Sequence, residues 1–184
     1  MDRSKLMLRS LTGAVFLIGT TASAHPHSDI DQQLLITLGV DDAALTYVIV
    51  PSIGSGPDFV SMIDTDTDGT ISPAEADQFA NAIAAATTIL ADDQTVELYD
   101  VFAIMPPVEN IMSATAPITV KATVEMPFAT SGIHSVGVDI AFDAMSHDWF
   151  IQPFYRSDLI DLTGTPELMR QNDTSAISIT AQTP

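Results

Sequence analysis

One twelve-residue segment, 64–75, constrains the fold of this chain more than any other. It carries aspartates at its first, third and fifth positions, a glycine at its sixth and a glutamate at its twelfth. These positions, with a backbone carbonyl at the seventh and a hydroxyl at the ninth, are the oxygen ligands with which a short loop wraps a calcium ion. The predicted ligands are Asp64, Asp66, Asp68, Thr70, Ser72 and Glu75. A loop of this kind joins two helices, so the segment predicts a helix–loop–helix.

The alternative is a solvated acidic loop without a metal, since a short run of aspartates can arise by chance in a chain this rich in them. Four residues beyond the aspartates also fall at the required offsets, namely Gly69, Ile71, Ser72 and Glu75. Gly69 stands where the chain turns sharply and a side chain would clash. We therefore interpret the segment as a single EF-hand loop that binds Ca²⁺.

The flanking residues support two helices. Pro57 suits a first helical turn, and the apolar residues Phe59, Val60 and Ile63 after it share one face. Downstream, the segment 72–75 is also a capping box, and a helix is predicted from residue 73 to about 90. Its apolar positions are Ala76, Phe79, Ala80, Ile83 and Leu90. Our hypothesis is that Ser72 and Glu75 cap this helix without calcium, and that Glu75 turns onto the metal when calcium is present.

The rest of the chain favours β structure. Alternating apolar residues or β-formers predict strands at 34–38, 44–50, 95–104, 117–127, 133–142, 149–154 and 176–180, with the first two joined by a turn at 39–42. This pattern predicts a mainly β (α+β) fold: an antiparallel β-sandwich in one domain, 25–184, with the EF-hand inserted at about 55–90.

Residues 1–24 are typical of a secretory signal peptide. A basic start precedes a short apolar run, and Ala22–Ala24 forms an A-x-A cleavage site. An uncleaved anchor is the alternative, but the run is too short to span a bilayer, and no later segment is long or apolar enough. The chain has no cysteine, so it forms no disulfide. These features predict a bacterial periplasmic or secreted protein without a membrane span after cleavage.

The mature chain is strongly acidic. The signal removes one of the 24 acidic residues and three of the six basic ones, which leaves 23 acidic residues, three basic residues and a net charge of −20. Such a surface repels phosphate backbones and anionic lipids, so the composition argues against nucleic acid as a partner. It attracts cations, although the acidic residues outside the loop are explained by solubility alone.

Histidines offer a second kind of metal site. Cleavage after Ala24 makes His25 the mature N-terminus, where an amine and an imidazole together chelate copper or nickel, with His27 or His147 as a further ligand. The alternative is an exposed tail without a metal. His134 and His147 are expected at strand ends as surface or core residues.

The mature region resembles exported bacterial proteins of unassigned function that begin with histidine and carry one EF-hand in a β domain. The resemblance is carried by the segments 24–27, 49–63, 64–75 and 149–153. Some relatives of that group are associated with nickel or zinc transport or with hydrogenase accessory systems, so the resemblance implies metal handling.

The chain shows little that indicates catalysis. It has no cysteine nucleophile, no Gly-x-Ser-x-Gly elbow and no phosphate-binding glycine loop. The sequence therefore predicts a non-enzymatic calcium-binding module, in which Ca²⁺ stabilises the fold or modulates contact with an unknown protein partner. The alternative is a transition-metal (Cu, Ni or Zn) binding or delivery protein that uses His25 and His27.

Overall fold

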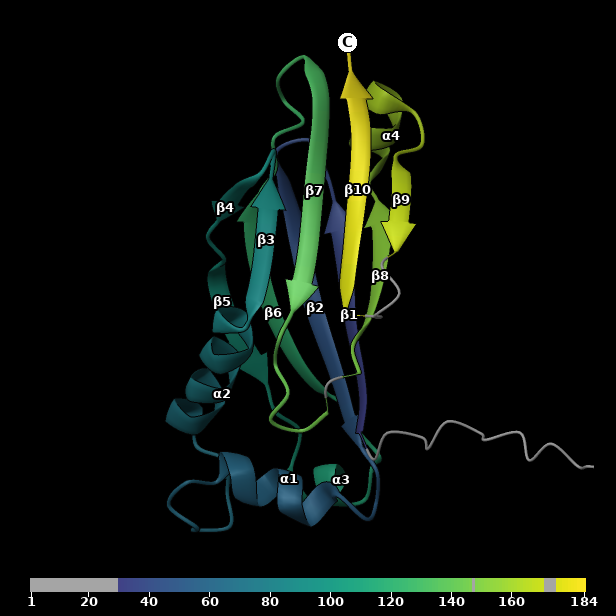
Figure 1. The fold of residues 1–184 in the computed structure, drawn as a ribbon. Coiled ribbons are helices and arrows are strands. Elements are labelled where there is room, and N and C mark those ends of the chain that lie inside the picture. The colour runs from purple at the N-terminus through teal and green to yellow at the C-terminus, as the bar shows by residue number, and fades with distance from the viewer. Residues whose placement is uncertain (1–29, 147, 171–174) are drawn as a thin grey trace, which may run out of the picture.

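Two five-stranded sheets pack face to face in this protein, with the apolar core between them (Figure 1). The computed structural model describes residues 30–146, 148–170 and 175–184. The first sheet has the order β5-β6-β2-β1-β8 and the second the order β4-β3-β7-β10-β9. The strands are β1 (Ile30–Leu38), β2 (Asp42–Pro51), β3 (Thr87–Ala91), β4 (Gln94–Val96), β5 (Tyr99–Ile104), β6 (Ile118–Glu125), β7 (Gly132–Ile140), β8 (Phe150–Tyr155), β9 (Glu167–Arg170) and β10 (Ala176–Thr183). The helices are α1 (Gly56–Ile63), α2 (Pro73–Ala85), α3 (Val108–Met112) and α4 (Ser157–Thr163).

The predicted fold class is confirmed. Burial alternates along β1, β2, β6, β7 and β10, because every second side chain faces the core between the sheets. The predicted hairpin is present: β1 pairs with β2 in antiparallel register, and Gly39 N–H donates to the Asp42 carbonyl at 2.8 Å across the turn. One pairing differs from a purely antiparallel sandwich, since β8 runs parallel to β1.

Two predicted boundaries are wrong. The helix expected from 73 to about 90 ends at Ala85, and residues 87–91 form β3. Leu90 therefore lies on a strand, 36% exposed, and not on the buried face of a helix. The reason is local: Thr87, Thr88 and Ile89 are β-branched, a type that packs better on a sheet than in a helix.

The strand expected over 95–104 is two strands. β4 belongs to the second sheet and β5 to the first, so the chain crosses between the sheets at 97–98. The pairing of β5 with β6 also contains a bulge between Tyr99 and Phe102, where Asp100 has a φ of 52°. Local alternation shows that residues are extended, but not which sheet they join.

Three further elements were not predicted. β9 pairs with β10, but all four of its residues are exposed, so it carries no alternating pattern. The helices α3 and α4 span only five and seven residues, too short for a helical period. In the described part of the chain, no helix has the length and apolarity to cross a membrane. The predicted signal peptide, 1–24, lies outside the described residues.

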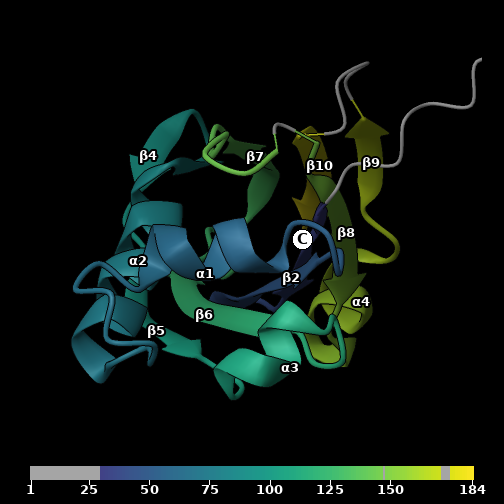
Figure 2. The ribbon, with the colours of Figure 1, turned by 90° about the horizontal axis from the view of Figure 1, so that it is seen from below.

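The helical hairpin lies at one end of the sandwich. In Figure 2, which looks onto that end, α1 lies across the sheets, with α2 on one side and α3 on the other. The loop between α1 and α2, the candidate metal site, is thus held at this end by helices that contact the core.

Candidate metal centre

Both helices of the hairpin are anchored through aromatic rings. α1 buries Phe59, Val60 and Ile63, as predicted, and α2 buries Ala76, Phe79, Ala80 and Ile83. The Phe59 and Phe79 rings meet edge to face with centroids 5.8 Å apart, and Phe79 contacts Phe142 in the same way at 6.2 Å. Such pairs stabilise beyond the area that they bury. The helices that flank the acidic loop are therefore held in fixed positions by the core.

Three of the four predicted carboxylates converge. Asp64, Asp66 and Asp68 each offer an oxygen, and these oxygens lie within 4.8 Å of one another. Asp64 is 6% exposed, whereas the other two are exposed. This is the spacing of oxygens around a common cation, since calcium takes its ligands at about 2.3–2.6 Å.

The loop backbone holds this arrangement. Asp64 accepts from the N–H of Asp68 at 3.1 Å and from the N–H of Gly69 at 2.9 Å, one on each carboxylate oxygen. Gly69 has a φ of 83°, and a Cβ there would have no atom within 4 Å. The clash expected at Gly69 is therefore wrong, and the glycine is needed for its backbone conformation and not for space.

The carboxylates of the cluster repel one another. The N–H of Asp68 lowers the pKa of Asp66, but loss of solvent and the negative charges of Asp68 and Glu75 outweigh it, so the pKa of Asp66 is raised. A carboxylate among like charges holds its proton more tightly. A bound cation would reverse this effect at Asp66.

Glu75 is turned toward the helix start and the loop entrance. Its Oε1 accepts from the N–H and the hydroxyl of Thr65 at 2.6 and 3.0 Å, and from the N–H of Asp66 at 3.4 Å. Its Oε2 accepts from the N–H and the hydroxyl of Ser72, both at 2.9 Å. The bond from the Ser72 N–H is the largest cause that lowers the pKa of Glu75 to about 2. Glu75 is thus fully ionised at neutral pH and is 7% exposed.

The predicted capping box is present. Ser72 caps α2, its hydroxyl accepting from the Glu75 N–H at 3.3 Å, while the Glu75 side chain returns to the Ser72 N–H. Thr70 is exposed, and both its N–H and its hydroxyl donate to Asp68, at 2.8 and 2.7 Å. Of the six predicted ligands, the structure therefore brings three carboxylates together and places Ser72 and Glu75 in the cap.

The residues fit calcium by their chemistry. Every side-chain donor in the segment is an oxygen, and a hard divalent cation prefers carboxylate and carbonyl oxygens. Glu75 Oε1 already accepts from the Asp66 N–H at 3.4 Å, and Glu75 would supply the bidentate ligand after giving up part of its cap. The segment contains no histidine, so a site for copper or nickel would have to lie elsewhere.

The residues of the alternative metal site, His25, His27 and His147, lie outside the described residues. His134 is described and buried, with both ring nitrogens bonded. Its environment was not predictable, because its main partner, Asp92, is 42 residues away in the sequence.

Comparison of the chain with models of protein families, with curated proteins and with solved structures finds no match. Function is therefore inferred from the chemistry of the site alone.

Proposed function

We propose that this protein is an exported, non-enzymatic calcium-binding module, in which one Ca²⁺ at the loop 64–75 stabilises the fold or modulates contact with a protein partner. The observation that carries the proposal is the convergence of the Asp64, Asp66 and Asp68 oxygens within 4.8 Å of one another. The loop sequence that surrounds them has the glycine and the terminal glutamate of a calcium loop at the required offsets.

Calcium would supply positive charge to a cluster that repels itself. Asp64 would act as the most fixed ligand, because it is buried and held by two backbone N–H groups. The exposed Asp66 and Asp68 would complete the acidic side of the sphere. Glu75 would exchange hydrogen bonds from Thr65 and Asp66 for the metal while α2 keeps the Ser72 hydroxyl as its cap.

A structural role is favoured over tight buffering. Loops of this type span Kd values from about 10⁻⁹ to 10⁻³ M, and a single unpaired loop is expected in the weaker range of about 10⁻⁶ to 10⁻³ M. Calcium at ten times its Kd stabilises a folded chain by about 1.4 kcal/mol. A stabilisation of this size raises the free energy of unfolding measurably, but it is too small to make folding depend wholly on calcium.

Transition-metal binding through His25 and His27 is the alternative function. It differs in metal preference, since an amine and imidazoles select copper, nickel or zinc, whereas carboxylates select calcium. The two proposals can be separated in one set of titrations.

The test is calorimetric titration of the metal-stripped protein with calcium, and then with copper and nickel. We expect one calcium per chain, lost in Asp64→Asn and retained in Asp77→Asn, an equal charge change at an exposed position of α2 outside the loop. Calcium binding that survives Asp64→Asn would refute the loop as the site. Copper or nickel binding lost only in His25→Ala would support the alternative function.

Glu75→Gln tests the glutamate separately. Because Gln carries one oxygen in place of two, it cannot act as a bidentate ligand, and a large loss of calcium affinity is expected. Unchanged affinity would show that Glu75 remains a capping residue only.

A further inference from the structure

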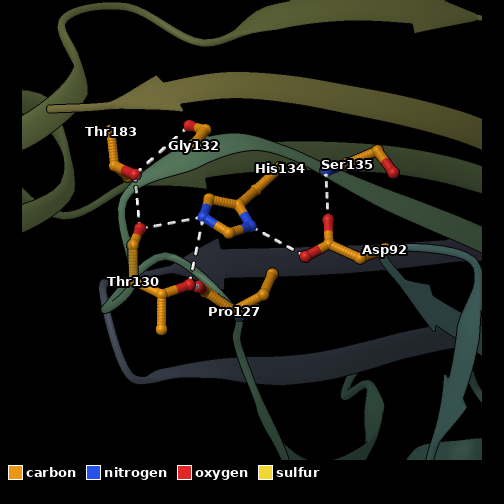
Figure 3. A network of polar contacts seen from close by, with 7 residues as sticks. All are labelled: Asp92, Pro127, Thr130, Gly132, His134, Ser135 and Thr183. Carbon is orange, nitrogen blue, oxygen red and sulfur yellow. Dashed lines mark hydrogen bonds and ion pairs between the residues drawn. The ribbon is translucent and has the colours of Figure 1, made fainter.

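A buried histidine lies near the end of the sandwich opposite the helical hairpin. β7 begins at the end away from α1 (Figure 1), and His134 is the first residue of its inward-facing row. His134 is 5% exposed. Its Nδ1 lies 2.7 Å from Oδ2 of Asp92, and its Nε2 lies 2.9 Å from the carbonyl oxygen of Thr130 (Figure 3).

Both partners of the ring are acceptors. A carboxylate and a backbone carbonyl have no hydrogen to donate, so each of these short contacts requires an N–H on the ring. A neutral imidazole has only one N–H, and an imidazolium has two. The geometry is therefore that of a doubly protonated, cationic His134.

The same geometry argues against a catalytic triad. Asp92, His134 and the Thr130 hydroxyl are arranged in the order of an acid, a base and a nucleophile, with Nε2 3.3 Å from the hydroxyl oxygen. A base must present an unprotonated Nε2, which would place its lone pair against the Thr130 carbonyl. The hydroxyl also lies 3.3 Å from the carbonyl of Pro127, to which it donates.

Three separate segments are joined by the hydrogen bonds around this ring. The β3–β4 turn supplies Asp92, whose Oδ1 accepts from the Ser135 N–H at 2.8 Å and whose N–H donates to the Ser135 carbonyl at 2.9 Å. The connection between β6 and β7 supplies the Thr130 carbonyl. The end of β10 supplies Thr183, whose hydroxyl donates to the same carbonyl and lies 3.2 Å from the Gly132 carbonyl (Figure 3).

We propose that His134 is a pH-operated lock, in which the imidazolium holds the β3–β4 turn and the β6–β7 connection together and releases one of them when the ring loses a proton. A neutral ring can keep its bond to Asp92 or its bond to Thr130, but not both. Because Thr183 shares the Thr130 carbonyl, release at that side also loosens the end of β10.

Few charges face the ring. Asp92 is the carboxylate in contact with it, and Asp93 follows on the same exposed turn. The segments 126–132 and 176–183 contain no titratable side chain, and on β7 the other titratable residue is Asp139, which is exposed. Phe128 meets the imidazole edge to face, with centroids 6.0 Å apart.

The sign of the pH effect follows from these contacts. The hydrogen bond to Asp92 raises the pKa of His134, and it outweighs burial, which lowers it. For Asp92, burial raises the pKa, but the His134 bond and the Ser135 N–H together lower it. The lock is therefore fully present below the unfolded histidine pKa of about 6.5 and is lost as the pH rises through the higher folded value.

The decisive test is a pH titration of the His134 ring by nuclear magnetic resonance, with the ring signals assigned by their absence in His134→Gln. We expect both ring nitrogens to be protonated below pH 6.5 in the unaltered protein, and the midpoint to lie above 6.5. Asp92→Asn should lower this midpoint. Asp93→Asn, the same charge change one residue along the turn, should leave it near its original value.

Unfolding provides the second measurement. Between pH 6.5 and the ring's midpoint in the folded protein, one linked proton raises the unfolding constant by up to about tenfold per pH unit, and His134→Gln should remove this part of the slope. A midpoint at or below 6.5 in the unaltered protein, or equal midpoints in Asp92→Asn and Asp93→Asn, would overturn the proposal. The titration of the unaltered protein decides the charge state even if a variant fails to fold.

Discussion

Substitution of Gly56 tests whether the contact between α1 and α3 restrains the helical hairpin. It is the first residue of α1 and is buried. A Cβ built on it would lie 2.8 Å from the Cα and 2.9 Å from the carbonyl oxygen of Met112, which closes α3. Both atoms belong to the backbone, so they cannot move aside as a flexible side chain does. Gly56→Ala must therefore push α1 and α3 apart.

Two effects oppose each other in Gly56→Ala. Alanine is preferred over glycine in a helix by about 0.5–1 kcal/mol. Forcing an extra methyl group into a packed contact costs about 1–3 kcal/mol. The clash outweighs the preference here because the contact is with backbone, and we expect a net loss of about 1–2 kcal/mol. For a chain of this length, that lowers the melting temperature by about 2–8 °C.

The assay is thermal and urea unfolding followed by circular dichroism, with Gly54→Ala as the matched control. At Gly54 the nearest atom to an added Cβ is the Ser52 hydroxyl, at 3.8 Å, so alanine fits there. Alanine at an unstrained position is neutral or stabilising, by up to about 1 kcal/mol. If Gly56→Ala were as stable as Gly54→Ala, the close approach of α1 and α3 would not restrain the hairpin.

Three further predictions follow from other contacts. Trp149→Phe should cost about 2 kcal/mol or more in urea unfolding, because it shrinks a fully buried side chain and leaves the Phe142 carbonyl without the indole N–H at 2.9 Å; a loss below 0.5 kcal/mol would contradict this. Gly39→Ala should cost about 1 kcal/mol or less by the same measurement. The three atoms nearest to the added Cβ belong to the flexible Arg156 side chain, and the ion pairs with Asp42 and Asp158 that it must leave are part-exposed and weak. Glu75 should contribute to acid unfolding: the Ser72 N–H and the other bonds lower its pKa from 4.5 to about 2, so its contribution is present above pH 4.5 and is lost as the pH falls through 2. The acid transition of Glu75→Gln, followed by circular dichroism, should depend less on pH in that window.

The sequence predicted those elements whose signal lies within a few consecutive residues. β6 alternates between buried and exposed side chains, and its apolar period of two is visible without any partner strand. The start of α2 is equally local, since Ser72 and Glu75 satisfy each other within one turn. The clustering of the three aspartates was predictable for the same reason, because the loop that brings them together is only a few residues long.

Elements that depend on distant partners were not predictable. β9 is exposed along its whole length and exists because β10 offers it a free edge. The switch of the chain between sheets at 97–98 leaves no local signal. The surroundings of His134 depend on Asp92 and on Thr183, which a sequence pattern does not relate to each other.

The end of α2 decides how the helical hairpin is connected to the sandwich. The EF-hand was expected as an insertion at about 55–90 within a single domain, and only Ala86 separates α2 from β3. The Ala86 carbonyl accepts from the Ala141 N–H at 2.8 Å. The Thr87 hydroxyl lies 2.9 Å from the Ile83 carbonyl, to which it donates, and 3.0 Å from the Tyr47 hydroxyl of β2 in the other sheet.

A shift of α2 therefore acts on both sheets at once. Thr87 begins β3 of the second sheet, and Tyr47, whose burial raises its pKa to about 12, packs edge to face on the buried Trp149 with centroids 5.9 Å apart. Tyr47 and Trp149 are fully buried, so a shift of α2 that breaks the Thr87 contacts disturbs the core beside the hairpin. The calcium ion that we propose for the loop would for this reason stabilise the whole sandwich against unfolding, and not the hairpin alone.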